Sequence, residues 1–370
     1  MTVWTIVALI AGIAALVIGA EGLVRGAARL AARTGMSPVV IGLTVVAFGT
    51  SAPELAVSIG DALRGGDEAG AIAVGNVVGS NIANILLVLG ISAAFGGALL
   101  VAQRIVRLDV PIMIGASVLV LLFALNGAIG RLEGAVLVVA LVVYITWTVA
   151  AARRGTPPPV GLEYEEALDP EKLAQSRVWA DLGFLVAGLG LLVVGSQLLV
   201  GAASDIASEL GVSDLVIGLT VVAIGTSLPE VATSVLAAVR GQRDLAVGNA
   251  IGSNLFNLLA VLGITAVVAP NPLPVAESAI QVDIPVMVAV AVACLPIFAN
   301  GHVLKRWEGF VFLMFYVGYL TWLVLDATDS GVRESYSNVM LFFVVPITVL
   351  TLALVGWRSR STPDHQLTGN

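Results

Sequence analysis

The sequence is poor in charge, cysteine and histidine, and each scarcity argues against a class of protein. Charged residues make up 12% of the 370 residues, well below the ~25% of a typical soluble domain. The single cysteine, Cys294, cannot pair within the chain, and two histidines are too few for a histidine-built metal site. The net charge is −7, and the sequence has no basic cluster of the kind that binds nucleic acid. The composition therefore argues against a soluble globular domain, a disulfide scaffold and a nucleic-acid-binding protein.

Apolar residues are abundant instead, at 58% of the chain, and the mean hydropathy is +1.00. A transmembrane helix needs about 20 mainly apolar residues, and eleven such runs follow one another along the sequence. The predicted fold class is therefore an all-α polytopic membrane protein. The expected spans are 3–28, 38–64, 71–98, 106–126 and 130–151, then 178–204, 214–240, 244–269, 278–299 and 305–326, and finally 336–356.

The spans and the polar stretches between them predict four parts and an orientation. The parts are a first half at 1–152, a polar linker at 153–177, a second half at 178–326, and a last span with a polar tail at 327–370. With this arrangement, 15 of the 18 Lys and Arg residues fall on one face, and the other face receives only Arg64, Arg131 and Arg333. Basic residues mark the cytoplasmic face. We therefore expect a protein of the cell (inner) membrane, with the amino terminus outside and the linker and carboxyl terminus in the cytoplasm.

The two halves repeat each other inside the membrane. Residues 39–64 (VVIGLTVVAFGTSAPELAVSIGDALR) match 215–240 (LVIGLTVVAIGTSLPEVATSVLAAVR), and 73–91 (AVGNVVGSNIANILLVLGI) match 246–264 (AVGNAIGSNLFNLLAVLGI). Because each half has five spans, an odd number, the second half should lie upside down relative to the first. Inverted repeats with a site at their interface are typical of secondary transporters. The best-matched stretches are polar, which favours a functional role over a duplication that is now only structural.

The first repeated motif places a glutamate after a proline near the middle of a span, at Glu54 in GTSAPE and at Glu230 in GTSLPE. Proline removes a backbone donor, so the helix should kink and leave carbonyl oxygens that only protein, water or an ion can satisfy. A carboxylate at this depth costs several kcal/mol unless it has a counter-charge or a function. No Lys or Arg lies at matching depth, which leaves a bound cation or a proton as the partner. The alternative is a neutral carboxyl bonded to a neighbouring helix.

The second repeated motif lies in the next span of each half, as GSNIAN and GSNLFN. Ser80 and Asn84, like Ser253 and Asn257, are four residues apart and share a helix face. These side chains either bond helix to helix or bind a hard cation. Together the motifs offer only oxygen ligands, which suits Ca²⁺, with its about 6–8 oxygen ligands, or Na⁺ better than Zn²⁺ or Cu²⁺. Two carboxylates balance the charge of one divalent ion.

Both motifs, duplicated in this order, resemble the signature repeats of the calcium/cation antiporter superfamily, and more narrowly its sodium/calcium exchanger type and prokaryotic relatives. The resemblance covers about residues 1–326. It implies cation sites at mid-membrane whose ligands are the side chains of Thr50, Ser51, Glu54, Ser80, Asn84, Thr226, Ser227, Glu230, Ser253 and Asn257, with the carbonyls of Ala47 and Ala223. Many relatives carry Asp in place of Asn84 or Asn257, which puts potassium dependence and proton coupling in question. The eleventh span is an addition to the usual ten.

The resemblance implies an antiporter and not an enzyme. Its substrates would be Ca²⁺ and Na⁺, exchanged by alternating access as spans 1 and 6 slide past a fixed core, without a cofactor. A Ca²⁺/H⁺ or other cation/proton antiporter on the same fold is the alternative. A passive channel is less favoured because the pseudo-symmetry lies within one chain. An intramembrane protease is disfavoured because neither histidine lies deep in a span and the sequence has no HExxH motif.

Overall fold

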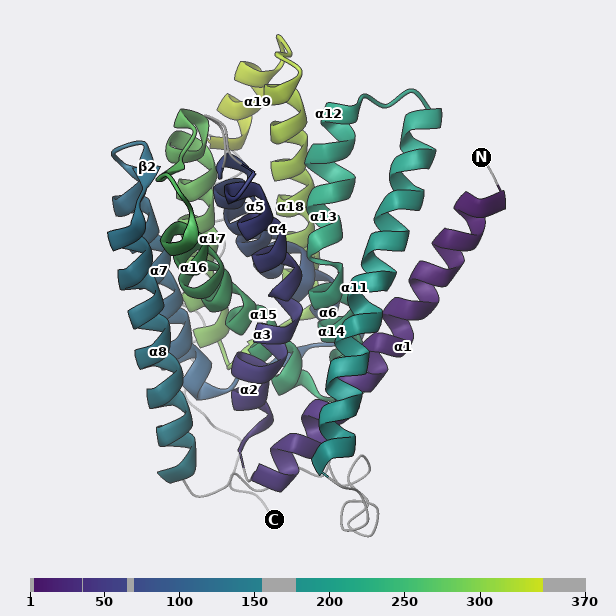
Figure 1. The fold of residues 1–370 in the computed structure, drawn as a ribbon, viewed down its shortest axis with the longest axis vertical. Coiled ribbons are helices and arrows are strands. Elements are labelled where there is room, and N and C mark those ends of the chain that lie inside the picture. The colour runs from purple at the N-terminus through teal and green to yellow at the C-terminus, as the bar shows by residue number, and fades with distance from the viewer. Residues whose placement is uncertain (1–2, 35, 65–69, 155–177, 342–370) are drawn as a thin grey trace, which may run out of the picture.

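The computed structural model describes residues 3–34, 36–64, 70–154 and 178–341, most of them helical (Figure 1). The first half contains α1 (Val3–Thr34), α2 (Pro38–Ile41), η1 (Gly42–Val46), α3 (Ala47–Thr50), α4 (Ala52–Ala62), α5 (Ala71–Ala83), η2 (Asn84–Leu89), α6 (Gly90–Gly96), β1 (Leu99–Leu100), η3 (Ile105–Asp109), α7 (Val110–Ala124), β2 (Ala128–Ile129) and α8 (Arg131–Arg154). The second half and the residues after it contain α11 (Val178–Glu209), α12 (Asp214–Ile217), η4 (Gly218–Val222), α13 (Ala223–Thr226), α14 (Leu228–Val239), α15 (Arg243–Phe256), η5 (Asn257–Val261), α16 (Leu262–Val268), β3 (Leu273–Pro274), η6 (Ala279–Asp283), α17 (Ile284–Ala299), β4 (Val303–Leu304), α18 (Arg306–Ala327) and α19 (Arg333–Val339). The η segments are π-helical, with wider turns than an α-helix.

The helices confirm the predicted class of an all-α polytopic membrane protein. Each of the ten runs expected between residues 3 and 326 is helical. Among the described residues, eight helices are long and apolar enough to cross a membrane by themselves, and up to nine if the bent pair Pro38–Thr50 and Ala52–Ala62 forms one span. The expected linker and eleventh span lie mostly outside the described residues.

The two halves are inverted relative to each other. In Figure 1 the first half rises from α2 through α3 to α4, whereas the second descends from α12 through α13 to α14. Two short antiparallel sheets join the halves. In one, β1 pairs with β4 (Leu99 opposite Leu304), and in the other, β2 pairs with β3 (Ile129 opposite Leu273). Each sheet takes one strand from each half, as a pseudo-two-fold axis in the membrane plane requires.

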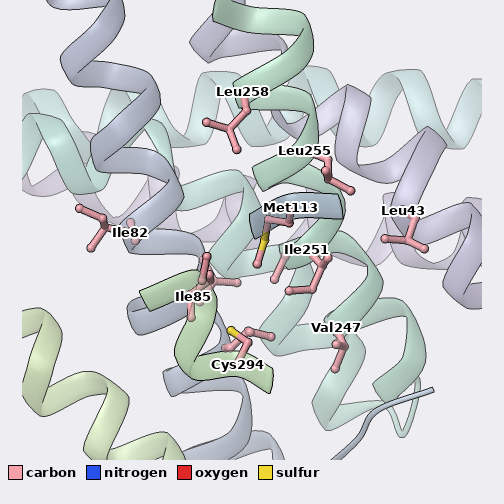
Figure 2. Close-up of a cluster of buried hydrophobic side chains, with 14 of the residues drawn as sticks. Leu43, Ile82, Ile85, Met113, Val247, Ile251, Leu255, Leu258 and Cys294 are labelled. Atoms are coloured by element: carbon pink, nitrogen blue, oxygen red, sulfur yellow. The ribbon is translucent and has the colours of Figure 1, made fainter. Parts of the chain in front are cut away.

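Two helices form the centre of the bundle. The stretches Ile72–Gly96 and Arg243–Val268 are 83% buried over their most apolar window, whereas the other single-helix candidate spans are between 11% and 44% buried. Figure 2 shows the apolar contacts at this centre, made by Ile82, Ile85, Val247, Ile251, Leu255 and Leu258 with Leu43, Met113 and Cys294. Because these two helices carry the GSN motifs, the motifs lie deep inside the protein.

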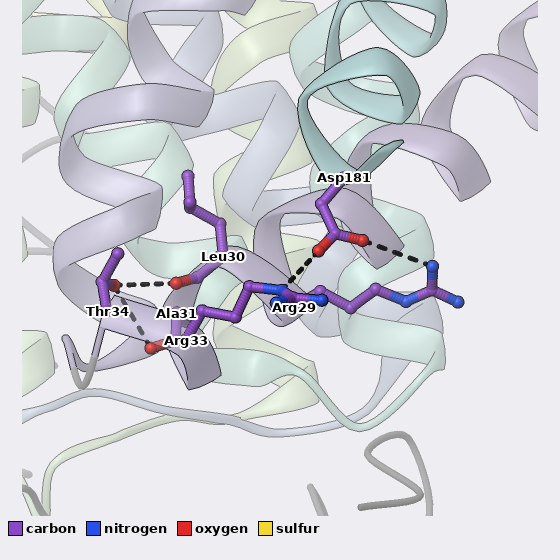
Figure 3. A network of polar contacts seen from close by, with 6 residues as sticks. All are labelled: Arg29, Leu30, Ala31, Arg33, Thr34 and Asp181. Atoms are coloured by element: carbon purple, nitrogen blue, oxygen red, sulfur yellow. Dashed lines mark hydrogen bonds and ion pairs between the residues drawn. The ribbon is translucent and has the colours of Figure 1, made fainter. Parts of the chain in front are cut away.

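The helices α1 and α11 form a closely packed pair beside this centre (Figure 1). Glycine recurs every seven residues along the contact, at Gly12, Gly19 and Gly26 in α1 and at Gly188 and Gly195 in α11. A Cβ on Gly19 would lie 2.8 Å from the Gly188 carbonyl oxygen, so only small residues allow this approach. At one end of the pair, Arg33 Nε lies 2.7 Å from Asp181 Oδ2 and Arg29 Nη1 lies 3.4 Å from Asp181 Oδ1 (Figure 3). The two helices are therefore held together as one unit.

Candidate functional site

The two proline motifs break their helices at the same point. In the first half, Ser51 separates α3 from α4 with φ −82° and ψ 2°, Pro53 lies in the first turn of α4, and the two pieces are bent by 41°. In the second half, Ser227 separates α13 from α14 with φ −87° and ψ 3°. The predicted breaks are confirmed. They place Glu54 and Glu230 in the first turns of α4 and α14, where unpaired backbone N–H groups favour negative charge.

The two glutamates form the centre of the site. Both side chains are 0% exposed, and they are close enough for the charge of Glu230 to act on Glu54. Neither carboxylate makes a hydrogen bond of ordinary geometry with the described residues. Two such carboxylates repel each other, and each uncompensated charge in a low-dielectric interior costs several kcal/mol. The pair therefore needs bound cations or protons.

Hydroxyl groups from both halves lie beside Glu230. Those of Thr50 and Ser51 come from the first half and that of Ser253 from the second. Thr50 Oγ1 also lies 3.2 Å from Ser253 Oγ, because α3 packs against α15. The structure thus brings these four predicted ligands together across the boundary between the halves.

The two motif asparagines begin π-helical segments. Asn84 starts η2 and Asn257 starts η5, both are 0% exposed, and neither amide has a partner within the described part of the chain. The segment η2 packs against α14, which carries Glu230, and η5 packs against α4, which carries Glu54. π-Helical turns are frequent at functional sites, and a buried amide without a hydrogen bond is rare. The amide oxygens therefore remain available as ligands.

The other predicted side-chain ligands lie on the same helices. The hydroxyls of Ser51 and Ser227 are buried, and neither makes a hydrogen bond of ordinary geometry within the described residues. Ser80 on α5 is 4% exposed, and α5 packs against α13, which begins at Ala223 and ends at Thr226. Contacts between helices thus repeat across the halves, with α3 against α15 and α13 against α5.

The carbonyl of Ala47 is already engaged within its own helix. It accepts the Ser51 N–H at 3.0 Å, and the Thr50 hydroxyl lies 3.4 Å from it. A cation at this oxygen would share it with these donors, so its role as a ligand stays a prediction.

Two asparagines outside the predicted set support the ligand-bearing turns. Asn249 accepts the Thr50 hydroxyl at 3.2 Å and donates to the Ser234 hydroxyl at 2.9 Å. Its counterpart Asn76 donates to the backbone carbonyl of Glu54 at 3.2 Å. The sequence could have identified both asparagines as candidates, because each is the last residue of a repeated string, AVGN, that comes just before the GSN motif.

A further contact ties α11 to the second helix break. Pro229 has no N–H, so the carbonyl of Gly225, four residues earlier, lacks its usual helical donor. The hydroxyl of Ser196 on α11 donates to that carbonyl. The repeat aligns Ser196 with Ala20 of α1, which has no hydroxyl. The contact therefore belongs to one half alone, and comparison of the repeats could not have revealed it.

The atoms gathered here determine what the site can bind. They are oxygens of carboxylates, hydroxyls, amides and carbonyls, and no group of three or more His, Cys, Asp or Glu side chains within the described ranges is placed to hold a metal. Transition metals prefer nitrogen or sulfur ligands, whereas Ca²⁺ and Na⁺ prefer oxygen. The unpaired buried oxygens therefore fit a hard cation.

Comparison with known proteins agrees with this chemistry. A family model described as sodium/calcium exchanger protein matches residues 4–150 and 181–325. CaxA of Alkalimonas amylolytica is 41% identical over 294 residues, which cover 78% of this chain and 89% of CaxA. The sodium/calcium exchanger MaX1 of Methanosarcina acetivorans is 34% identical over 322 residues, covering 79% and 90% of the two chains. The structure of the sodium-calcium exchanger NCX_Mj is similar with a TM-score of 0.71 at 30% identity, over 86% of this chain and 98% of that one.

Proposed function

The chain belongs to the sodium/calcium exchanger protein family, and we propose that it exchanges Ca²⁺ for Na⁺ across the membrane. The observation that carries the proposal is the pair of buried carboxylates, Glu54 and Glu230, which make no hydrogen bond of ordinary geometry with the described residues. Hydroxyls from both halves lie beside one of them, Glu230. One Ca²⁺ balances both charges, and Na⁺ ions can replace it on the same oxygens.

Coupling follows from the cost of an empty site. Without a cation, two carboxylate charges would cross the low-dielectric centre uncompensated, so movement of the empty carrier is penalised. Binding of either ion removes this penalty. Because both ions use the same oxygens, one ion must leave before the other can bind and be carried. This makes the exchange obligatory.

Alternating access would come from the α1–α11 pair. The two helices form one unit, and α1 contacts the core through α2 and α14. Sliding of this pair along a fixed centre of α5 and α15 would open the site first to one face and then to the other.

The two halves, 1–152 and 178–326, would act as one carrier, joined by the linker at 153–177. Because most basic residues fall on the face of the linker and the carboxyl terminus, that face would be cytoplasmic and the amino terminus outside. In this orientation the expected direction of Ca²⁺ transport is export.

Ca²⁺ flux into vesicles tests the proposal. The purified protein is placed in liposomes loaded with Na⁺, K⁺ or choline, and Ca²⁺ uptake is followed with and without a protonophore. We expect uptake only from Na⁺-loaded vesicles, with no effect of the protonophore. Uptake that needs a proton gradient would instead establish a Ca²⁺/H⁺ antiporter. Uptake without any counter-ion gradient would establish a channel, and either result would overturn the proposal.

A further inference from the structure

Two buried hydroxyl groups outside the candidate site are unpaired. Ser92 on α6 and Thr265 on α16 are both 0% exposed, and neither hydroxyl makes a hydrogen bond of ordinary geometry with the described residues. The repeat aligns these two residues with each other, as it aligns Ser80 with Ser253. A buried hydroxyl without a partner is destabilising. Its presence at the same place in both halves therefore indicates a role other than packing.

Contacts between α6 and α14 place Ser92 beside Ser234. A Cβ on Gly96, the last residue of α6, would lie 2.5 Å from the Cβ of Ala238, near the end of α14, and η2, which precedes α6, also packs against α14. The two helices therefore run in the same direction. Ser92 lies one turn before Gly96 and Ser234 lies one turn before Ala238, so both face this contact. Glu230 lies one further turn back on the same face of α14.

The other half repeats this arrangement between α16 and α4. The two helices pack against each other, and the repeat aligns Ser58 with Ser234 and Thr265 with Ser92. Ser58 and Ser234 are both 0% exposed, and Ser58 lies one turn after Glu54. All four aligned positions thus carry a hydroxyl. We refer to Ser92 with Ser234, and to Thr265 with Ser58, as the two hydroxyl layers.

An asparagine fixes one hydroxyl of each layer. Asn249 Nδ2 donates to Ser234 Oγ at 2.9 Å, and Asn76 Nδ2 donates to Ser58 Oγ at 3.1 Å. Each serine oxygen keeps a second lone pair that can face a ligand. The same two asparagines also bond to the ligand-bearing turns of the central site. The hydroxyl layers are therefore held next to the two glutamates.

We propose that the two hydroxyl layers are transit sites, where a cation exchanges water for hydroxyl oxygens on its way between the carboxylates and each face of the membrane. One layer lies toward the end of α14 and the other toward the end of α4, which point to opposite faces (Figure 1). Oxygen ligands suit Na⁺ and Ca²⁺. Uncharged hydroxyls bind such ions weakly enough to release them, as passage requires. The inference rests on the proposed function, because the layers serve the same central site.

Reaction with Ag⁺ tests the route without requiring transport. Ag⁺ is a soft cation that binds thiolates. Ser92→Cys and Thr265→Cys are made separately on a Cys294→Ala background, and each purified protein is exposed to Ag⁺ in chloride-free buffer with Na⁺, then unfolded and reacted with a fluorescent maleimide. We expect Ag⁺ to remove most of the maleimide labelling in both variants. The control is the unchanged protein, whose Cys294 is 0% exposed among apolar side chains and should keep its labelling.

The labelling result and the flux of the unchanged protein have separate consequences. Labelling that survives Ag⁺ in both folded variants, or that is lost equally from Cys294, would overturn the transit sites even where the unchanged protein exchanges Na⁺ for Ca²⁺. Failure of the unchanged protein to take up Ca²⁺ from Na⁺-loaded vesicles would instead overturn the proposed function.

Removal of one hydroxyl separates transit from packing. Ser92→Ala should slow Ca²⁺ flux about tenfold, while the Kd for Ca²⁺ stays within about twofold because the carboxylates are untouched. Ser92→Thr, which keeps the hydroxyl, should restore the flux. The matched control is Ser117→Ala on α7, a buried serine whose hydroxyl donates to the Met113 carbonyl at 2.9 Å, and it should keep its flux. Unchanged flux in folded Ser92→Ala protein would overturn the proposal.

Discussion

Replacing Glu230 with glutamine should weaken Ca²⁺ binding far more than the small change in shape suggests. Glutamine keeps the size of the side chain and one oxygen, but it leaves Glu54 alone to balance a divalent ion. The Glu230 side chain is 0% exposed, so solvent cannot make up for the lost charge. Removing one partner of a buried ionic contact costs about 3–5 kcal/mol. At about 1.4 kcal/mol per factor of ten, the Kd for Ca²⁺ should rise about 10²- to 10⁴-fold.

Calorimetric titration of the purified protein with Ca²⁺ measures this change, and flux into liposomes gives a second readout. The matched control is Glu133→Gln, because the Glu133 carboxylate accepts the Gly130 N–H at 3.1 Å at the start of α8, outside the site. The control should keep its Ca²⁺ affinity within about twofold of the original. If Glu230→Gln binds Ca²⁺ as tightly as the unchanged protein does, the two carboxylates do not share the ion and the reasoning fails.

Three further substitutions, two of them paired with a control variant, test the packing and the chemistry around the site. Gly188→Ala places a Cβ 2.7 Å from the Gly19 carbonyl oxygen and should lower stability by about 1–3 kcal/mol, seen as a lower Tm in detergent. Gly190→Ala, with no neighbour within 4 Å, should leave the Tm unchanged. Ser196→Ala leaves the Gly225 carbonyl without its hydroxyl donor, at a cost of about 1–3 kcal/mol, and should change the rate of Ca²⁺ flux, whereas Ser196→Thr should restore it. Asn257→Asp adds a third carboxylate, which is neutral at low pH, so its flux should match the original at low pH and diverge as pH rises. A constant ratio of the two fluxes across pH would contradict this prediction.

Much of the candidate site could be predicted because it depends on properties of single residues and of their neighbours within one helical turn. The helix breaks follow from the missing N–H of Pro53 and Pro229, which acts within one turn whatever surrounds it. The choice of Glu54 and Glu230 follows from the cost of a carboxylate among apolar residues, and the repeat marked both positions. The sequence alone therefore predicts that Glu54 and Glu230 lie on broken helices, without knowledge of any tertiary contact.

Other parts of the site depend on contacts that no local property specifies. Asn249 was present in the repeated string, but its bond to Thr50 joins residues 199 positions apart. Ser196 gave no signal at all, because its counterpart Ala20 has no hydroxyl and the contact exists in one half alone. The π-helical starts at Asn84 and Asn257 likewise depend on how the central helices pack, since π-helical and α-helical turns have no distinct sequence pattern here.

The sequence by itself determined the apolar helices, their breaks, the inverted repeat and the oxygen-bearing residues, because hydrophobicity and backbone chemistry act over a few residues. Only the tertiary structure decided which helices face one another. It placed Thr50 3.2 Å from Ser253, 203 residues away, and it buried the carboxylates of Glu54 and Glu230 close enough for the charge of one to act on the other. The physical reason is that close packing selects one arrangement of helices from many with the same apolar pattern, and ligands from separate helices meet only in that arrangement.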